Sequence, residues 1–263
     1  MITNSSVVDV RVDVPSATII LNRPQSKNAL NLDTIKKLSL AFSDIHQEKN
    51  VAAVILTGSS DSFCSGTDLK EMSASLEDEN SREKWHDETM AMNDLVESML
   101  RFPKPIIAAV NGPAVGVGLA LVLASDLVVA SPNAKFGSPE TKRGLVAGLV
   151  APLLAFRLGA STAMKLTLTG RHLDADEALS IGLSHETVKD DLLWARANEM
   201  AKELSGNSPL AMKMTKTLIN ETIGEHFLTS LNLGTANSAA ARTTESAKEG
   251  VDAFVEKRPP NWP

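Results

Sequence analysis

The sequence predicts an α/β protein in which a parallel sheet with crossover helices is followed by a purely helical C-terminal region. Short apolar runs alternate with helical patterns through the first part of the chain, and the order strand, helix, strand is typical of parallel sheets. Beyond about Asp190 the strand patterns stop, and helically spaced apolar residues follow. We therefore expect a sheet-containing core over residues 1–190 and a helical region over residues 191–263.

The first elements are an antiparallel start to this sheet and its first crossover helix. In residues 8–14, valines alternate with charged residues, as in a half-buried strand. Residues 18–21 predict a second strand, which ends before Pro24 because proline cannot donate to a strand ladder. Asn31 is placed to cap a helix with apolar residues at helical spacing. The apolar run 51–56 then predicts a strand that is buried on both faces.

The later elements follow the same logic of apolar runs separated by glycine and proline. A charged segment with a weak apolar face (Met90, Leu95, Met99 and Leu100) predicts a helix over residues 77–101. Strands are expected at residues 106–110, 126–130 and 135–136. Helices are expected at residues 119–124, 148–158, 162–168, 174–179, 225–241 and 244–256, with Gly159, Gly170 and Gly182 ending three of them.

Composition excludes several classes of function. The 263 residues are 43% hydrophobic, enough for a sizeable core, and the net charge of −6 predicts no broad basic surface for nucleic acid. The single cysteine, Cys64, excludes an internal disulfide and a cysteine-based metal cluster. No His, Asp and Glu cluster has metal spacing, so no metal site is expected. No signal peptide or membrane span is predicted, and we expect a cytoplasmic protein.

A glycine-rich turn over residues 111–118 follows the strand at 106–110. A strand, a glycine-rich turn and a buried helix can present free backbone N–H groups to an anion, because glycine lets a ligand approach the backbone. The same pattern also serves as a plain strand-to-helix connection. Neither GxGxxG nor GxxxxGK[ST] is present, so the standard phosphate loops are excluded.

Six segments, in the same order and over nearly the whole chain, resemble motifs of the crotonase (enoyl-CoA hydratase/isomerase) superfamily. They read NRP with NAL in residues 22–30, FCSGTDLKEM in 63–72, PIIAAVNGPAVGVG in 105–118, FGSPE in 136–140, LTGR with a later GL in 168–183, and FVEKRP in 254–259. Each motif is modest alone, but six in order are highly specific.

The resemblance implies a crotonase-like spiral of ββα units over residues 1–190 and a helical trimerisation region over residues 191–263. It implies an acyl-CoA thioester as the ligand, with coenzyme A part of the substrate and no separate cofactor, and a place in fatty acid metabolism. It also implies a homotrimer or a hexamer of paired trimers. The charge and the lack of a long apolar run predict no nucleic-acid or membrane partner.

Motif positions imply the catalytic groups. The backbone N–H groups of Thr67 and Val117 would bind the thioester oxygen and stabilise an enolate, an interaction typically worth about 3–4 kcal/mol per donor. The family usually has alanine and glycine there, so the larger side chains should narrow the pocket. Glu140, in FGSPE, would move the proton. The resemblance also implies substrate contacts by Lys27, Ala29, Ser65, Gly66, Asp68, Leu69, Lys70, Gly116 and Pro139, the two lysines toward the coenzyme A phosphates.

One departure from the family pattern bears on the reaction. Enoyl-CoA hydratases use two glutamates, and the position of the first is Ala120 in this chain. A single carboxylate resembles the Δ3,Δ2-enoyl-CoA isomerases and predicts that Glu140 alone shuttles a proton between two carbons. Two alternatives stay open. One is a hydratase-like lyase that borrows another group, such as Asp87, Glu88 or His86. The other is a catalytically weak acyl-CoA-binding protein.

Other residues are expected to be structural or lie outside the reaction. Asp68 is also expected to cap the short helix after Thr67, and Asp126 to hold a strand end. Cys64 lacks a paired histidine signature, so no nucleophilic role is expected. Lys257 and Arg258 form a basic end that is either solvated or reaches the coenzyme A of a neighbouring subunit.

Overall fold

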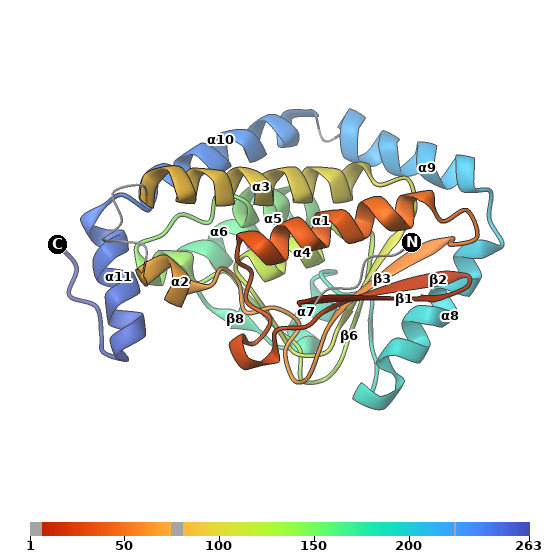
Figure 1. Ribbon diagram of the computed structural model, residues 1–263, viewed down its shortest axis with the longest axis horizontal. Coiled ribbons are helices and arrows are strands. Elements are labelled where there is room, and N and C mark those ends of the chain that lie inside the picture. Colours follow the sequence, from red (N-terminus) through yellow and green to blue (C-terminus); the bar gives the residue numbers. More distant parts are fainter. Residues whose placement is uncertain (1–6, 75–80, 224) are drawn as a thin grey trace.

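The computed structural model describes residues 7–74, 81–223 and 225–263, and its centre is a six-stranded sheet (Figure 1). The strand order is β1-β2-β3-β4-β6-β9, with β1 antiparallel to β2 and every other pair parallel. The strands are β1 (Val8–Asp13), β2 (Ser16–Leu21), β3 (Ala53–Gly58), β4 (Ile106–Val110), β6 (Leu127–Ala130) and β9 (Glu186–Thr187). From β2 onward, each new strand therefore joins the same growing edge.

A second, smaller sheet forms beside the first. It consists of β5 (Pro113–Val115), β7 (Lys135–Gly137) and β8 (His172–Leu173), in that order. Two isolated bridges, Leu30 with Thr67 and Cys64 with Ala114, extend the same pairing toward earlier parts of the chain. Each pass of the chain thus adds one segment to each sheet, which is the predicted spiral of ββα units.

The two faces of the main sheet are covered by different helices, which explains why its central strands are apolar throughout. Alternate residues of β4, such as Ile106 and Ala108, belong to the main core together with α1, α3 and α4. The residues between them, Ile107 and Ala109, pack against α8 instead. Figure 1 shows α8 below the sheet and α1 and α3 above it. The C-terminal helical region therefore contributes to the core through α8.

The helices of the core and the C-terminal region lie mostly above the sheets, where α3 and α10 run side by side (Figure 1). They are α1 (Leu32–Gln47), α2 (Leu69–Ala74), α3 (Ser81–Arg101), α4 (Val117–Ala124), α5 (Val150–Leu158), α6 (Ala160–Thr169), α7 (Ala175–Ser180), α8 (Leu193–Ser205), α9 (Pro209–Thr217), α10 (Glu225–Ala241) and α11 (Glu245–Glu256). Short 3₁₀ turns lie at Pro24–Ser26, Glu140–Arg143 and Asp190–Leu192, and a π-helical segment lies at Leu218–Ile223. No described helix is long and apolar enough to cross a membrane.

Local signals in the sequence explain the element boundaries. The side chain of Asn31 accepts a hydrogen bond from the N–H of Thr34 at 3.0 Å, which confirms the predicted cap of α1. Asp126 accepts hydrogen bonds from the N–H of Ile106 at 2.8 Å and from Lys216 Nζ at 2.7 Å, which confirms its structural role at a strand end. The carboxylate therefore joins β4 to the C-terminal end of α9.

Three expectations differ from the structure. Residues 113–115, predicted as part of a turn, form β5, and the two-residue strands β8 and β9 were not predicted. Such strands are too short for a period-two pattern, and their partners lie far away in the chain. Met90 is 39% exposed, because the buried face of α3 is formed by Trp85, Met92, Leu95, Val96, Met99 and Leu100. Residues 77–80 of the predicted helix lie outside the described residues.

Candidate active site

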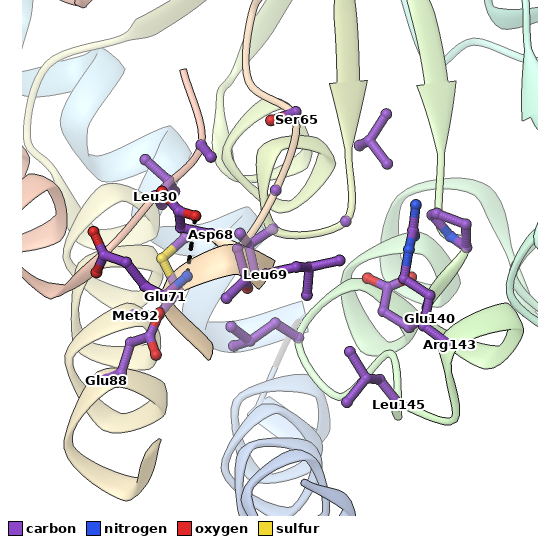
Figure 2. A pocket seen from close by; sticks show the side chains of 18 of the residues that line it. Leu30, Ser65, Asp68, Leu69, Glu71, Glu88, Met92, Glu140, Arg143 and Leu145 are labelled. Carbon is purple, nitrogen blue, oxygen red and sulfur yellow. Dashed lines mark hydrogen bonds between the residues drawn. The ribbon is translucent and has the colours of Figure 1, made fainter. Parts of the chain in front are cut away.

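A cavity of about 750 Å³ is lined by the second sheet and the loops beside it, by α2 and α3, and by C-terminal residues that include Arg242 and Phe254. All of the site residues predicted from the motifs line this one cavity: Lys27, Ala29, Ser65, Gly66, Thr67, Asp68, Leu69, Lys70, Gly116, Val117, Pro139 and Glu140. They come from four separate segments of the chain, and Figure 2 shows several of them around the pocket. Their grouping makes a common ligand physically possible, and their individual roles stay predictions.

The loop before α2 and the glycine-rich loop before α4 pack backbone against backbone. The N–H of Val115 donates to the carbonyl oxygen of Cys64 at 2.9 Å, and the N–H of Cys64 donates to that of Pro113 at 3.0 Å. A side chain at Gly118 would lie 2.3 Å from the carbonyl oxygen of Cys64, so this close approach requires glycine. Each loop therefore fixes the position of the other.

Gly66 and Gly116 face each other across this junction, and each immediately precedes one of the predicted oxyanion donors. Both have a positive φ, +104° and +56°, which side-chain-bearing residues rarely adopt. These conformations set the orientation of the next peptide, which carries the N–H of Thr67 or Val117. In the described part of the chain, the N–H groups of Thr67 and Val117 donate no hydrogen bond. That of Val117 belongs to the first turn of α4, where helices leave donors free and the helix dipole favours negative charge.

Glu140 lies directly beside this pair of donors. It begins the short 3₁₀ turn Glu140–Arg143, and its Oε1 lies only 3.2 Å from the point where a Cβ on Gly116 would lie. Ser138 Oγ donates to Glu140 Oε2 at 2.6 Å, which orients the carboxyl group. Burial raises the pKa of Glu140, against the lowering effects of the Ser138 hydrogen bond and the Arg143 charge. The site thus combines a basic carboxylate with two free N–H donors.

Arg143 and Phe254 form a part of the wall that the motifs did not indicate. The guanidinium of Arg143 lies 4.8 Å from the centre of the Phe254 ring, on α11. Both residues line the cavity, as do His172 of β8 and Leu145 after the 3₁₀ turn. Figure 2 shows Arg143 close to Glu140. The sequence does show an arginine three residues after the glutamate of FGSPE. It does not show that this side chain lines the cavity, because the orientation of the side chain depends on the packing of α11.

The chain matches known proteins along nearly its whole length. Residues 16–263 match the family model for enoyl-CoA hydratase/isomerase. The chain belongs to the enoyl-CoA hydratase/isomerase family. It is 35% identical over 249 residues to a putative enoyl-CoA hydratase of Thermus thermophilus, with 94% of this chain and 96% of that one covered. It is also 35% identical over 244 residues to the short-chain-enoyl-CoA hydratase of Clostridium acetobutylicum, with 92% of each covered.

Solved structures of this family have the same fold. An enoyl-CoA hydratase from Mycobacterium avium subsp. paratuberculosis superposes with a TM-score of 0.86 at 28% identity, covering 99% of this chain and all of that one. An enoyl-CoA hydratase/isomerase from Pseudoalteromonas atlantica gives a TM-score of 0.84 at 32% identity, covering 98% and 100%. These matches confirm the predicted crotonase-like fold. The protein is an acyl-CoA-processing enzyme of the enoyl-CoA hydratase/isomerase family, although the relatives' names cover both reactions.

The position of the missing hydratase glutamate faces the protein interior in this family member. Ala120 lies on α4, is fully buried in the main hydrophobic core and does not line the cavity. Of the other carboxylates on the cavity wall, Asp68 forms an ion pair with Arg23 at 3.0 Å. Asp68 also accepts from the N–H of Glu71 at 3.4 Å, near the start of α2 as predicted for a cap. Asp68 is therefore held in a structural arrangement. Glu71, also on the wall, lies 3.6 Å from Arg23 and accepts a hydrogen bond from Asn31.

Another carboxylate on the wall, Glu88 of α3, was named among the alternatives. It forms an ion pair with Arg242 at 3.1 Å, and both side chains are largely buried. Burial raises the pKa of Glu88, and the nearby Arg242 lowers it. Asp87 and His86, also on α3, are exposed and do not line the cavity. No sequence signal pointed to Arg242, because it lies 154 residues from Glu88.

The rim and the loops account for the other residues considered. Lys27 and Lys70 are exposed at the cavity and have no ion-pair partner in the described part of the chain, so their charges are available to phosphates. Burial raises the pKa of the Cys64 thiol to about 12, which agrees with the absence of a nucleophilic role. Arg258 forms ion pairs with Glu249 and Glu256. No cluster of metal-ligating side chains occurs among the described residues.

Proposed function

We propose that the protein is an enoyl-CoA isomerase that converts a 3-enoyl-CoA thioester to the conjugated 2-enoyl-CoA. The observation that carries the proposal is the carboxylate of Glu140 beside the N–H groups of Thr67 and Val117, with Ala120 at the position of the first hydratase glutamate. Isomerisation needs one group that removes and returns a proton, together with donors that stabilise the enolate between the two steps. Hydration needs an activated water as well, and Ala120 supplies no group to hold it.

In this mechanism the Glu140 carboxylate removes a proton from the α-carbon, and the electron pair moves onto the thioester oxygen. The N–H groups of Thr67 and Val117 donate to the resulting oxyanion of the dienolate. The electron pair then returns to the carbon chain as protonated Glu140 delivers the proton to the γ-carbon. The raised pKa of Glu140 assists the first step, because a more basic carboxylate accepts a carbon-bound proton more readily.

Hydration with Glu88 as the second acid/base group is the competing function. Its support is that Glu88 lines the cavity and has a raised pKa, and that many relatives are named hydratases. Against it, Figure 2 shows Glu88 and Glu140 on opposite sides of the pocket. Glu88 is also bound to Arg242. Two carboxylates that activate one water must both be within hydrogen-bond reach of it.

The test compares two reactions in three proteins. The wild type, Glu140→Gln and Glu88→Gln are assayed for conversion of 3-enoyl-CoA to 2-enoyl-CoA and for hydration of 2-enoyl-CoA. We expect isomerisation well above hydration in the wild type, a loss of about 10²–10⁴-fold in kcat for Glu140→Gln, and much smaller loss for Glu88→Gln. Fast hydration that depends on both glutamates would replace this proposal with the competing one. Tight thioester binding without either reaction would favour a binding protein.

We also propose that the protein assembles as a homotrimer or a hexamer, as its family resemblance implies. Large apolar side chains are exposed along the C-terminal helices: Leu210, Met214, Leu218 and Leu233 are each more than half exposed. Exposed apolar surface of this kind is typical of subunit interfaces. Light scattering coupled to size-exclusion chromatography is expected to give a mass of three or six chains, and a monomer would refute the proposal.

A further inference from the structure

The ion pair between Glu88 and Arg242 lies on the cavity wall, and the proposed reaction has no use for it. Glu88 lies on α3, and Arg242 directly follows α10. Their side chains are 17% and 8% exposed, and both line the cavity. Taking two charges out of water is costly, and apolar side chains of similar volume usually serve as well or better for stability alone. A contribution to stability therefore does not explain why a buried ion pair is present at this place.

Much of the hydrogen-bonding capacity of this pair is unused. Arg242 donates from Nη1 to Glu88 Oε2, and this is its one hydrogen bond within the described residues. A guanidinium has five N–H donors and a carboxylate has two accepting oxygens. Further donors of Arg242 and the second oxygen of Glu88 thus remain for a group inside the cavity. Ser238, one helical turn before Arg242, adds a hydroxyl to the same wall.

Alignment of the two helices does not depend on this pair. Further along the same contact between α3 and α10, Thr235 Oγ1 donates to Asn93 Oδ1 at 3.0 Å, and Asn93 Nδ2 donates to Asn232 at 3.0 Å. Asn93 and Thr235 are buried, are satisfied by each other and do not line the cavity. This second polar contact already fixes how the helices lie together, whereas Glu88 and Arg242 are the part that opens onto the cavity.

The pair lies across the cavity from the carboxylate of the proposed reaction. Figure 2 shows Glu88 across the pocket from Glu140, and Leu69 lies between them in this view. Apolar residues, including Leu69, Met92 and Leu145, line the space around them. A thioester whose reacting carbons lie at Glu140 would therefore pass apolar side chains before its far end meets Glu88 and Arg242.

The surrounding charges indicate what that far end can carry. Burial is the main cause of the raised pKa of Glu88, and the negative charges of Glu71 and Asp68 add to it. Asp68 and Glu71 are themselves paired with Arg23. A carboxylate on the substrate would still meet the negative charge of Glu88, while an ammonium would meet the fixed positive charge of Arg242. A neutral group that both donates and accepts, such as a hydroxyl, can donate to Glu88 and accept from Arg242 without either conflict.

We infer that Glu88 and Arg242 form a specificity subsite for an acyl-CoA whose distal end carries a neutral hydrogen-bonding group, a terminal hydroxyl. This inference rests on the proposed function only in taking an acyl-CoA thioester as the ligand with its reacting end at Glu140. It holds whether the bound thioester is isomerised or hydrated, because the subsite contacts the unreactive end of the chain.

Calorimetric binding to the full-length protein tests the inference independently of the reaction. Saturated acyl-CoA thioesters of increasing length are each compared with the ω-hydroxy thioester of the same length. Saturated chains lack the double bond that the reactions require. We expect one chain length at which the hydroxy compound binds about tenfold more tightly, as two additional hydrogen bonds would provide. In Glu88→Met/Arg242→Met, which removes both charges together, that preference should disappear.

A matched control lies in the same helix contact. Thr235→Val removes the buried hydroxyl bound to Asn93 without touching the cavity, and it should leave the tenfold preference unchanged. Equal binding of the plain and hydroxylated thioesters by the wild type at every length would overturn the inference, as would tighter binding of ω-carboxy or ω-amino thioesters. The wild-type comparison stands even if the double variant does not fold. Absence of isomerase activity would refute the proposed function and leave this measurement intact.

Discussion

Replacement of Gly116 by alanine tests the arrangement of the oxyanion donors and the carboxylate together. Gly116 has φ +56° and ψ −125°, a combination available almost only to glycine. An added Cβ would lie 3.2 Å from Glu140 Oε1, closer than most real contacts of a Cβ, and 3.9 Å from the Cα of Gly66. The substitution therefore strains the peptide that carries the Val117 N–H and pushes on the carboxylate at the same time.

The structure allows separate magnitudes for stability and catalysis. Forcing alanine into such a backbone conformation costs about 1–3 kcal/mol of the free energy of unfolding. Misdirecting one oxyanion donor costs about 2.7–4 kcal/mol in the transition state, which is about 10²–10³-fold in kcat. We expect Gly116→Ala to show both losses. The catalytic loss should appear in kcat, because the donor acts most strongly on the charge that develops during the reaction.

A second glycine separates strain from catalysis. Gly159, between α5 and α6, has φ +84° and ψ 155°, and an added Cβ would meet nothing within 4 Å. Gly159→Ala should lose a similar free energy of unfolding in urea titrations, while its kcat in the isomerase assay stays near that of the wild type. If Gly116→Ala keeps a kcat within about threefold of Gly159→Ala, the N–H of Val117 is not an oxyanion donor and the reasoning is refuted.

Three further predictions follow from the same geometry. Burial raises the pKa of Glu140 above its unfolded value, so the folded wild type binds more protons in the interval between the two values and loses stability as the pH rises through it. In urea titrations, the free energy of unfolding of Glu140→Gln should therefore equal that of the wild type at about pH 4 and exceed it at about pH 8. The difference should be about 1.4 kcal/mol for each tenfold change in proton affinity between the folded and unfolded states. Equal stability at both pH values would contradict the buried position of this carboxylate. The Cys64 thiol, whose pKa is raised to about 12, should resist thiol reagents at about pH 8 until the protein unfolds, and rapid labelling of the native protein would show that its loop opens. Lys27→Ala and Lys70→Ala should each raise the KM for the thioester several-fold at low salt with little change in kcat, and the effect should shrink as salt is added; an effect independent of salt would argue against phosphate contacts.

Much of the fold follows from local patterns. Apolar runs marked β2, β3, β4 and β6, because strands covered on both faces must be apolar throughout. Asn31 marked the start of α1, because its side chain satisfies a free N–H there. The strands β5, β8 and β9 escaped prediction, because two or three residues carry no periodicity and are ordered by partners elsewhere in the chain.

The candidate site could likewise be predicted from the sequence only in part. The sequence by itself determined the family, the glycines that precede Thr67 and Val117, the presence of Glu140 and the absence of a glutamate at Ala120. These are properties of single positions, recorded in motifs. Only the tertiary structure decided that Glu88 and Arg242 meet on the cavity wall. They lie 154 residues apart, and the contact depends on the packing of α3 against α10. Local sequence records which backbone conformations and buried surfaces a segment needs, but it does not record which distant side chain completes a site.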